Sequence, residues 1–357
     1  MKFRWGFYGF LFVFPGLSNT AFSGELIELY RGARAQAMGN AFVAIADDEE
    51  AIFYNPAGLA GTQKHILNYM ALDLSTSTDL ILSYQEGLSA FKNLSGDSLN
   101  VIIGKNIFAR SQFAPSFLMP NFGVAAIVDG QFAIESQNKA LPQLTLGYQT
   151  TNGIQAGYGI SLNRGFRRKG DLRFGIAAKI LWRRGGYHLL PLLSLISLSQ
   201  NTIKELSGSY ERGIGLDFGG QYLFNFTNHF SASLGVAYTD VGDTYFGGQA
   251  DTIKGNLTAG MALQYSLKLS KITFAYDFRH ILNETDWRKK SHIGVEVAVP
   301  FLSIYGGINQ VNLTYGASFD AWLFKITVLS FAEELGSFVH QDSMRQWLVK
   351  TALKFDL

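Results

Sequence analysis

Histidine, serine and acidic side chains are the groups with which this sequence could build a catalytic site. It has six histidines and no cysteine, so thiol catalysis and thiolate metal sites are excluded. It has no Gly-x-Ser-x-Gly elbow, and neither a His-Glu-x-x-His pair nor a calcium loop. An enzyme that transfers lipid acyl groups is the competing class, but its residues would have to come from distant strands. We therefore expect no enzyme, no cofactor and no metal site.

Glycines at residues 213–219 are similar in spacing to a dinucleotide fingerprint, but the third glycine comes one residue late. The stretch also lies within an alternating apolar and polar pattern, which is typical of a strand. We interpret these glycines as strand positions that face the interior.

Charged residues form two groups that are far apart in the sequence. One group lies near the N-terminus and the other lies on the polar side of alternating segments. Buried charges need partners, so we expect the two groups to form a paired, structural network. The groups are Arg31, Arg34, Asp47, Asp48, Glu49 and Glu50, and Arg173, Lys179, Asp217, Asp277, Arg279 and Glu296.

Residues 31–61 are rich in alanine and glycine, which allow close packing inside another structure. A short helix is predicted over residues 49–54, with Asp47 or Asp48 as its cap. The helix must end at Asn55, because a residue before proline is driven out of the helical region. The motif Asn55, Pro56, Ala57 and Gly58 then fixes the local chain geometry.

Most of the later sequence alternates between apolar and polar residues, as strands with two different faces do. In residues 272–278, for example, Ile272, Phe274, Tyr276 and Phe278 alternate with Thr273 and Asp277. Only 16% of residues are charged, which is low for a soluble domain. The net charge of +2 gives no signal for nucleic-acid binding. A soluble sandwich would also alternate, so the pattern alone leaves that fold open.

The N-terminus favours a secreted protein. Lys2 and Arg4 precede an apolar run, and Ala21, Phe22 and Ser23 suit a signal peptidase. We expect a signal peptide over residues 1–23, with an uncleaved anchor as the alternative, and a location in the outer membrane of a Gram-negative bacterium. No later segment approaches the length of a spanning helix, so a membrane protein of this sequence would be a closed barrel.

Counting back from the terminal strand places the longer connections outside the cell and the short turns in the periplasm. About 14 strands follow from residue 108 onward, within a range of 12–16, with residues 66–73 and 78–84 as additional candidate strands. One outer connection is almost wholly apolar and either collects hydrophobic ligands or packs over the rim as a lid. It contains Leu189, Leu190, Leu192, Leu193, Leu195, Ile196 and Leu198.

The run from Gly32 to Gly39, with Ala46-Asp47-Asp48 and Asn55-Pro56-Ala57-Gly58, resembles the N-terminal hatch of the FadL-like outer-membrane proteins. That superfamily includes long-chain fatty acid transporters, TodX-type hydrocarbon channels and PorV-like barrels of a secretion system. The resemblance implies an all-β fold: a monomeric, antiparallel transmembrane β-barrel whose lumen holds a helical and coil hatch. The expected parts are the hatch over residues 24–62 and the barrel over residues 63–357.

The expected function is passive uptake of a hydrophobic small molecule, such as a fatty acid or hydrocarbon, through a channel gated by the hatch. The expected partners are this ligand, outer-membrane lipid and lipopolysaccharide, and the barrel assembly machinery. The alternative is a PorV-like barrel that binds a partner protein and transports nothing. The sequence leaves both open.

Overall fold

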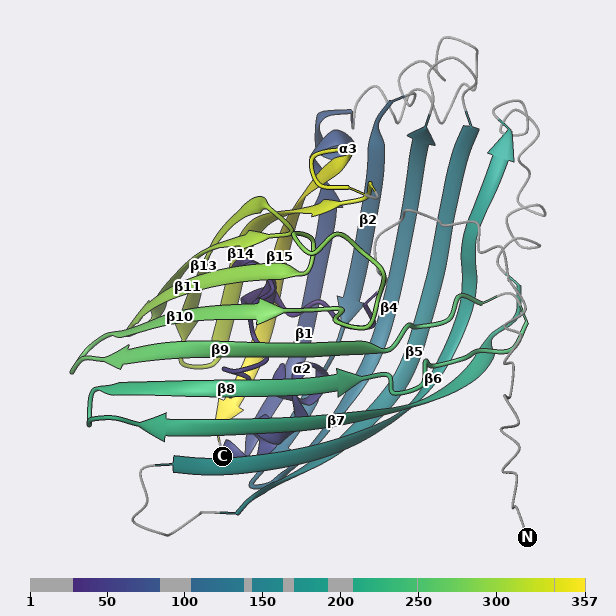
Figure 1. Ribbon diagram of the computed structural model, residues 1–357. Helices are drawn as coiled ribbons and strands as arrows, with labels where there is room; N and C mark the ends of the chain where they lie inside the picture. The colour runs from purple at the N-terminus through teal and green to yellow at the C-terminus, as the bar shows by residue number, and fades with distance from the viewer. Residues whose placement is uncertain are drawn as a thin grey trace, which may run out of the picture.

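The chain forms a closed antiparallel barrel of 14 strand positions, as expected from its alternating segments. The computed structural model describes residues 28–83, 104–137, 143–162, 170–191, 208–248, 250–336 and 338–356. From β4 to β15 each strand pairs with its neighbours in sequence, and β15 closes the ring on β1 (Figure 1). The strands are β1 (Ile66–Ser77), β2 (Asn106–Phe113), β3 (Ser116–Met119), β4 (Phe122–Gln137), β5 (Gln143–Ser161), β6 (Gly170–Pro191), β7 (Glu211–Asn225), β8 (Phe230–Thr239), β9 (Asn256–Ser266), β10 (Lys271–Phe278), β11 (Ser291–Val299), β12 (Leu302–Asn309), β13 (Asn312–Ala321), β14 (Phe324–Glu334) and β15 (Ser343–Asp356).

One strand position is divided in two. Both β2 and β3 pair with β1 on one side and with β4 on the other, so together they occupy one place in the wall. Ala114 and Pro115 separate them, and proline has no N–H to donate to a neighbouring strand. The partner strand β1 is irregular between Tyr69 and Leu72, where Met70 has a φ of 51°. The break and the bulge together bend the wall here.

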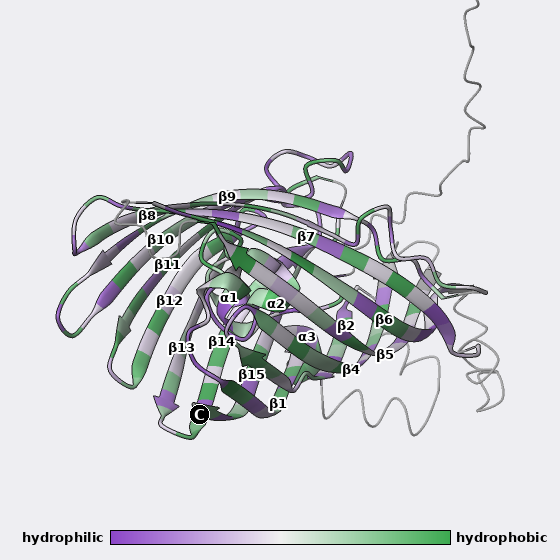
Figure 2. Cartoon of the chain, turned by 90° about the horizontal axis from the view of Figure 1, so that it is seen from below, coloured by the Kyte–Doolittle hydropathy of each residue, from purple (hydrophilic) through white to green (hydrophobic). Residues whose placement is uncertain are grey.

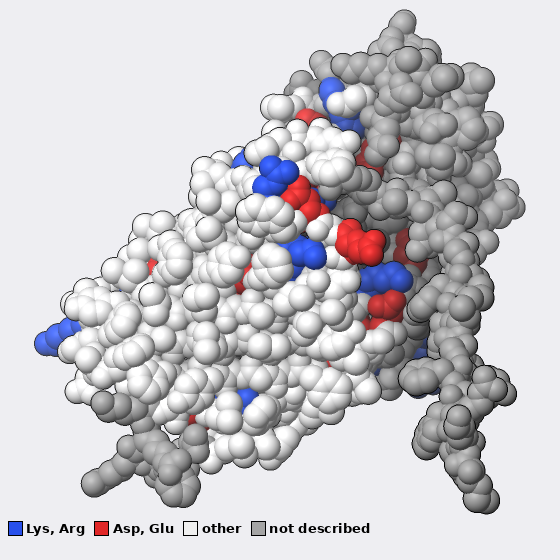
Figure 3. All heavy atoms as spheres, in the orientation of Figure 1, with Lys and Arg blue, Asp and Glu red and all other residues white. Residues whose placement is uncertain are grey.

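The outer face of the wall is apolar, which suits contact with lipid, and the inner face is polar, which suits a polar lumen. On β10, Ile272 and Phe274 are exposed on the outside, whereas Thr273 and Asp277 are fully buried inside. Figure 3 shows that the outer face of β7–β11 is almost free of charged side chains, which gather at one end of the barrel. The outer wall is therefore suited to contact with lipid. No helix within the described residues is long and apolar enough to cross a membrane.

The N-terminal segment lies inside this ring (Figure 2). It contains α1 (Ala33–Ala37), α2 (Ala51–Tyr54) and the 3-10 helix η1 (Pro56–Gly61), and we call residues 28–62 the hatch. The helix α2 ends before Asn55, which is extended as expected for a residue before proline. The helix begins later than predicted, at Ala51. Its N-cap is Glu50, and no side chain caps it, although Asp48 Oδ1 accepts a hydrogen bond from Glu50 N.

The connections differ in length at the two ends of the barrel. At the short-turn end, residues 226–229, 267–270, 300–301 and 322–323 form connections of two to four residues. At the long-loop end, residues 240–255, 279–290 and 335–342 form longer connections, in agreement with the predicted asymmetry, whereas residues 310–311 form a tight turn there.

Two sequence predictions about elements were wrong. Residues 78–84 were a candidate strand, but Thr78–Leu82 is the helix α3, whose N-cap Ser77 accepts a hydrogen bond from Leu80 N. Short apolar runs do not distinguish strand from helix. The apolar connection was expected to begin at Leu189, whereas the backbone of residues 189–191 still belongs to β6 and pairs with β5. Residues 192–198 of that connection lie outside the described residues.

Candidate functional site: the hatch and the cavity beside it

The hatch backbone lies directly against glycines of the wall. A Cβ atom on Gly219 would lie 2.1 Å from Asn55 Oδ1, and one on Gly175 would lie 2.2 Å from the carbonyl carbon of Pro56. On the opposite part of the wall, a Cβ on Gly294 would lie 2.3 Å from Met38 O. These positions need glycine because the hatch occupies the space of a side chain.

Asn55 joins two parts of the hatch to the wall. Its side-chain Nδ2 donates to Val43 O at 2.8 Å and to Gly220 O at 3.2 Å, and its Oδ1 accepts from Ala57 N at 3.1 Å. Asn55 is fully buried, as are Pro56, Ala57 and Gly58, which form the start of η1. The motif seen in the sequence therefore lies at a contact between hatch and wall.

Arg34 is the centre of an ionic cluster at the short-turn side of the hatch. Its guanidinium lies 2.7 Å from Glu296 of β11, 2.7 Å from Asp47 and 2.9 Å from Asp48. Burial raises the pKa of Asp48 to about 7, with a further contribution from Glu49, although Arg34 opposes the shift. The predicted hatch charges and one predicted wall charge thus meet at Arg34.

Two lysines of the wall hold the neighbouring acidic residues of the hatch. Lys325 Nζ of β14 lies 3.5 Å from Glu49 Oε1, and Lys350 Nζ of β15 lies 2.9 Å from Glu50 Oε1. Lys350 also donates to the hydroxyl of Tyr30 at 3.1 Å. Neither lysine was among the predicted site residues. Their alternation with apolar residues was visible, but their partners depend on the position of the hatch.

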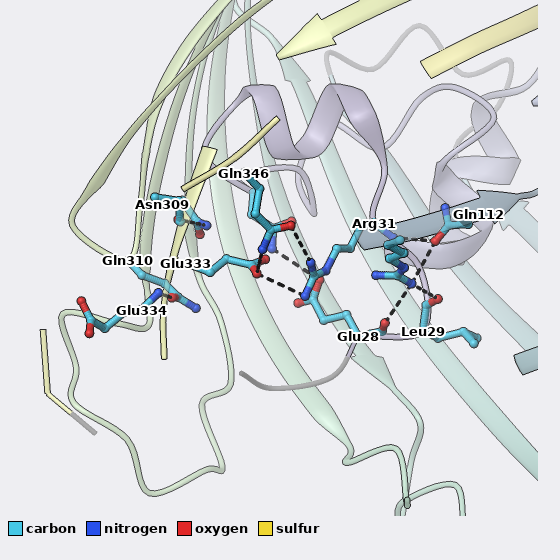
Figure 4. Close-up of polar contacts among 12 residues, drawn as sticks. Glu28, Leu29, Arg31, Gln112, Asn309, Gln310, Glu333, Glu334 and Gln346 are labelled. Atoms are coloured by element: carbon cyan, nitrogen blue, oxygen red, sulfur yellow. Dashed lines mark hydrogen bonds and ion pairs between the residues drawn. The ribbon is translucent and has the colours of Figure 1, made fainter. Parts of the chain in front are cut away.

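Arg31 occupies a second cluster, which Figure 4 shows between the hatch and β14 and β15. Its Nη2 lies 3.2 Å from Glu333 Oε2. Gln346 Nε2 donates to the same Glu333 oxygen at 2.9 Å, and Gln346 Oε1 lies 3.5 Å from Arg31 Nη1. Glu333, near the end of β14, was also not among the predicted site residues.

Glu28 and Arg279 form the ion pair closest to the long-loop end of the hatch. His280 Nε2 lies 3.6 Å from the same carboxylate. Burial opposes ionisation of Glu28, but Arg279 and His280 outweigh it and lower its pKa to about 2. Glu28 is therefore an anion that anchors the beginning of the hatch.

The remaining predicted wall charges have no ionic partner among the described residues of the hatch. Asp277 accepts hydrogen bonds from the hatch backbone, from Phe42 N at 2.7 Å and Val43 N at 2.8 Å. Lys179 pairs within the wall, at 2.8 Å from Asp217 and 2.9 Å from Asp240. Arg173 pairs with Asp171, also in the wall.

A cavity of about 440 Å³ lies between the hatch and the wall, and this volume is in the range of small-molecule sites. Its hatch side is formed mainly by Leu29, Tyr30, Val43, Phe53 and Tyr54. Its wall side includes residues of the long-loop end: Glu135, Tyr187, Asp240, Asp251, Ile253 and Lys254. No cluster of three or more potential metal ligands occurs among the described residues. The volume of the cavity is sufficient for a small molecule.

The fold and the hatch define the class of protein: a transmembrane barrel with an internal hatch. Two solved structures share this fold: a deletion mutant (deltaS2S3) of the monoaromatic hydrocarbon channel TodX and the toluene transporter TbuX of Ralstonia pickettii. The TodX mutant is 11% identical, with a TM-score of 0.52 over 91% of this chain and 98% of that chain. TbuX is 12% identical, with a TM-score of 0.51 over 94% of this chain and 99% of that chain.

Both structures are hydrocarbon channels of the FadL family, so the resemblance seen in the hatch sequence is confirmed at the level of the fold. No family model and no curated protein matches the sequence.

Proposed function

We propose that the protein is a channel of the Gram-negative outer membrane for passive uptake of a hydrophobic small molecule. The observation that carries this proposal is the cavity of about 440 Å³, whose hatch side presents the rings of Tyr30, Phe53 and Tyr54. Tyr30 and Phe53 stack with their centroids 4.0 Å apart, so they form a continuous aromatic surface. The fold shared with TodX and TbuX supports the same function.

The proposed path begins at the long-loop end, passes through the cavity and continues past the hatch. Asn55 supports a role for the hatch as a gate, because one side chain holds Val43, Ala57 and the wall together. Loss of these three hydrogen bonds would release η1 from β7. In this proposal, ligand entry shifts the hatch from that position, and no chemical step occurs.

Substitution of Ala237 tests the channel. This residue is buried and lines the cavity on β8, so Ala237→Phe would fill part of the space. We expect Ala237→Phe to reduce uptake of toluene into proteoliposomes by about tenfold, as expected for a well-packed pocket. Val236→Phe is the matched control, because Val236 is the adjacent residue and faces outward. Equal uptake by both variants and the unaltered protein would contradict transport through this cavity.

A partner-binding barrel without transport is the second candidate function. The ion pairs of Arg31, Arg34, Glu49 and Glu50 with the wall favour it, because they hold the hatch as a fixed plug. Purification from native membranes in mild detergent distinguishes the two functions. A stoichiometric protein partner together with no uptake of any hydrophobic probe, neutral or charged, would replace the channel with the partner-binding barrel.

A further inference from the structure

The charges around the cavity define the chemistry of its ligand more narrowly than the aromatic surface does. Three cationic side chains line the cavity, among the described residues: Lys179, Lys254 and Arg279. Each already has a carboxylate partner. Lys179 lies between Asp217 and Asp240, Lys254 is 3.0 Å from Asp243, and Arg279 pairs with Glu28. A bound carboxylate would therefore have to break an existing ion pair.

Two acidic side chains of the same lining are in the opposite situation. Glu135, near the end of β4, and Asp251, in the connection between β8 and β9, have no ion pair among the described residues. Arg183 is the cation near Asp251, but its Nη1 donates to the main-chain carbonyl of Asp251, at 3.0 Å, and not to the carboxylate. The carboxylate of Asp251 accepts a hydrogen bond from the main-chain N–H of Tyr187, and its Oδ2 atom has no hydrogen-bond partner among the described residues.

The same lining includes a surface that suits an aromatic or aliphatic body. That surface is formed by Leu29, Tyr30, Phe53 and Tyr54 of the hatch. A neutral hydrocarbon could cover it, but would take water away from the half-buried Glu135 and Asp251 without offering either carboxylate a cation, at a cost in free energy. A ligand with a protonated amine satisfies both sides, since its cation can pair with a carboxylate and interact with an aromatic face.

We infer that the cavity selects a small amphipathic amine, in which an aromatic or aliphatic body carries one ammonium group. Glu135 and Asp251 bind the ammonium group, and the rings of Tyr30, Phe53 and Tyr54 bind the body. This inference rests on the proposed channel function and names its substrate class. It separates this protein from a channel that takes a neutral hydrocarbon or a fatty-acid anion.

Three probes of similar shape test the inference: 2-phenylethylamine, ethylbenzene and phenylacetate. Their affinities for the purified full-length protein in detergent are measured at pH 7.5, where the first is a cation and the last an anion. We expect 2-phenylethylamine to bind at least about tenfold more tightly than either of the others, as one charge-assisted hydrogen bond allows. Uptake of the three probes into proteoliposomes is measured in parallel.

The substitutions Glu135→Gln and Asp251→Asn keep the shape of each side chain and remove its charge. Each substitution should lower the affinity for 2-phenylethylamine by about tenfold and change the affinity for ethylbenzene by less than about twofold. Glu284→Gln removes the same charge at an exposed loop position that does not line the cavity, and should change neither affinity. Urea unfolding of each variant verifies that the barrel is intact.

The outcomes separate this inference from the proposed function. If ethylbenzene or phenylacetate binds as tightly as the amine, the proposed substrate class is wrong. The same holds if both substitutions leave the affinity for the amine unchanged. In either case the proposed channel function is not contradicted. If none of the three probes binds or enters proteoliposomes, the channel and the inference are both wrong. Preference for the amine that both substitutions abolish supports the inference.

Discussion

Lys350 in the last strand and Glu50 in the hatch form an ion pair of 2.9 Å, although 300 residues separate them in the sequence. Both side chains are 2% exposed, so neither charge has water as an alternative partner. The pair fixes α2 of the hatch to β15, the strand that closes the barrel.

Removal of one partner of this pair should destabilise the barrel strongly. We expect Lys350→Met to lower the free energy of unfolding by about 3–5 kcal/mol, because Glu50 would stay buried without a cation. Urea unfolding of the protein in detergent micelles, followed by tryptophan fluorescence, measures the change. The double variant with Glu50→Gln should recover part of the loss, since it removes the stranded charge.

Lys254→Met is the control for burial. Lys254 is 62% exposed and pairs with Asp243, so its loss should cost less than about 1 kcal/mol. Equal losses for the two lysine variants would show that burial does not determine the strength of these pairs.

Gly219 and Gly220 should respond differently to the same substitution. A Cβ on Gly219 would collide with Asn55, whereas one on Gly220 would meet no atom within 4 Å. We expect Gly219→Ala to destabilise the docked hatch by about 1–3 kcal/mol and Gly220→Ala to change stability by less than about 0.5 kcal/mol. Limited trypsin cleavage after Arg31 or Arg34 reports the release of the hatch. Faster cleavage in Gly220→Ala than in Gly219→Ala would contradict the role of the wall glycines.

Asn55→Ala should loosen the hatch, and Asn55→Asp should loosen it further. Alanine removes three hydrogen bonds and leaves the carbonyl of Val43 without its donor, at a cost of about 1–3 kcal/mol. Aspartate places a carboxylate beside two carbonyl oxygens, which repel it. The same trypsin assay and urea unfolding measure both variants, and an aspartate variant as stable as the parent protein would exclude this arrangement.

The lowered pKa of Glu28 predicts that the free energy of unfolding falls in acid. Its pKa is lowered from 4.5 to about 2 in the folded protein, so the unfolded chain binds a proton first as the pH falls. The contribution of Glu28 is complete above about pH 4.5 and is lost between pH 4.5 and about pH 2; it amounts to roughly 3 kcal/mol. Urea midpoints measured from pH 2.5 to pH 6 should depend less on pH in Glu28→Gln. The exposed-loop variant Glu284→Gln should keep the full dependence.

Local patterns were sufficient to predict the wall. The alternation of Ile272 and Phe274 with Thr273 and Asp277 follows from the two-residue period of a strand, which needs no knowledge of the neighbouring strands. The end of α2 before Asn55 was predictable for the same reason, because Pro56 acts on the residue before it.

Contacts across the lumen were not predictable. Arg31 pairs with Glu333 and Arg34 with Glu296 because the hatch lies at one depth in the barrel, and no local pattern determines that depth. The sequence prediction also gave Asp277 a cationic partner, whereas backbone N–H groups of the hatch satisfy its carboxylate. The cavity is invisible in the sequence because Glu135, in β4, and Asp251, in the connection between β8 and β9, come from distant parts of the chain.

The contact between the hatch and β15 has a consequence for biogenesis. The hatch is synthesised first and β15 last, and β15 completes the ring by pairing with β1, the strand that follows the hatch. A ring closed around an empty lumen would leave Lys350, Glu333 and Asp277 without the partners that the hatch supplies. The hatch therefore makes closure of the ring more favourable, and we expect the N-terminal segment to act as a template for the final step of assembly.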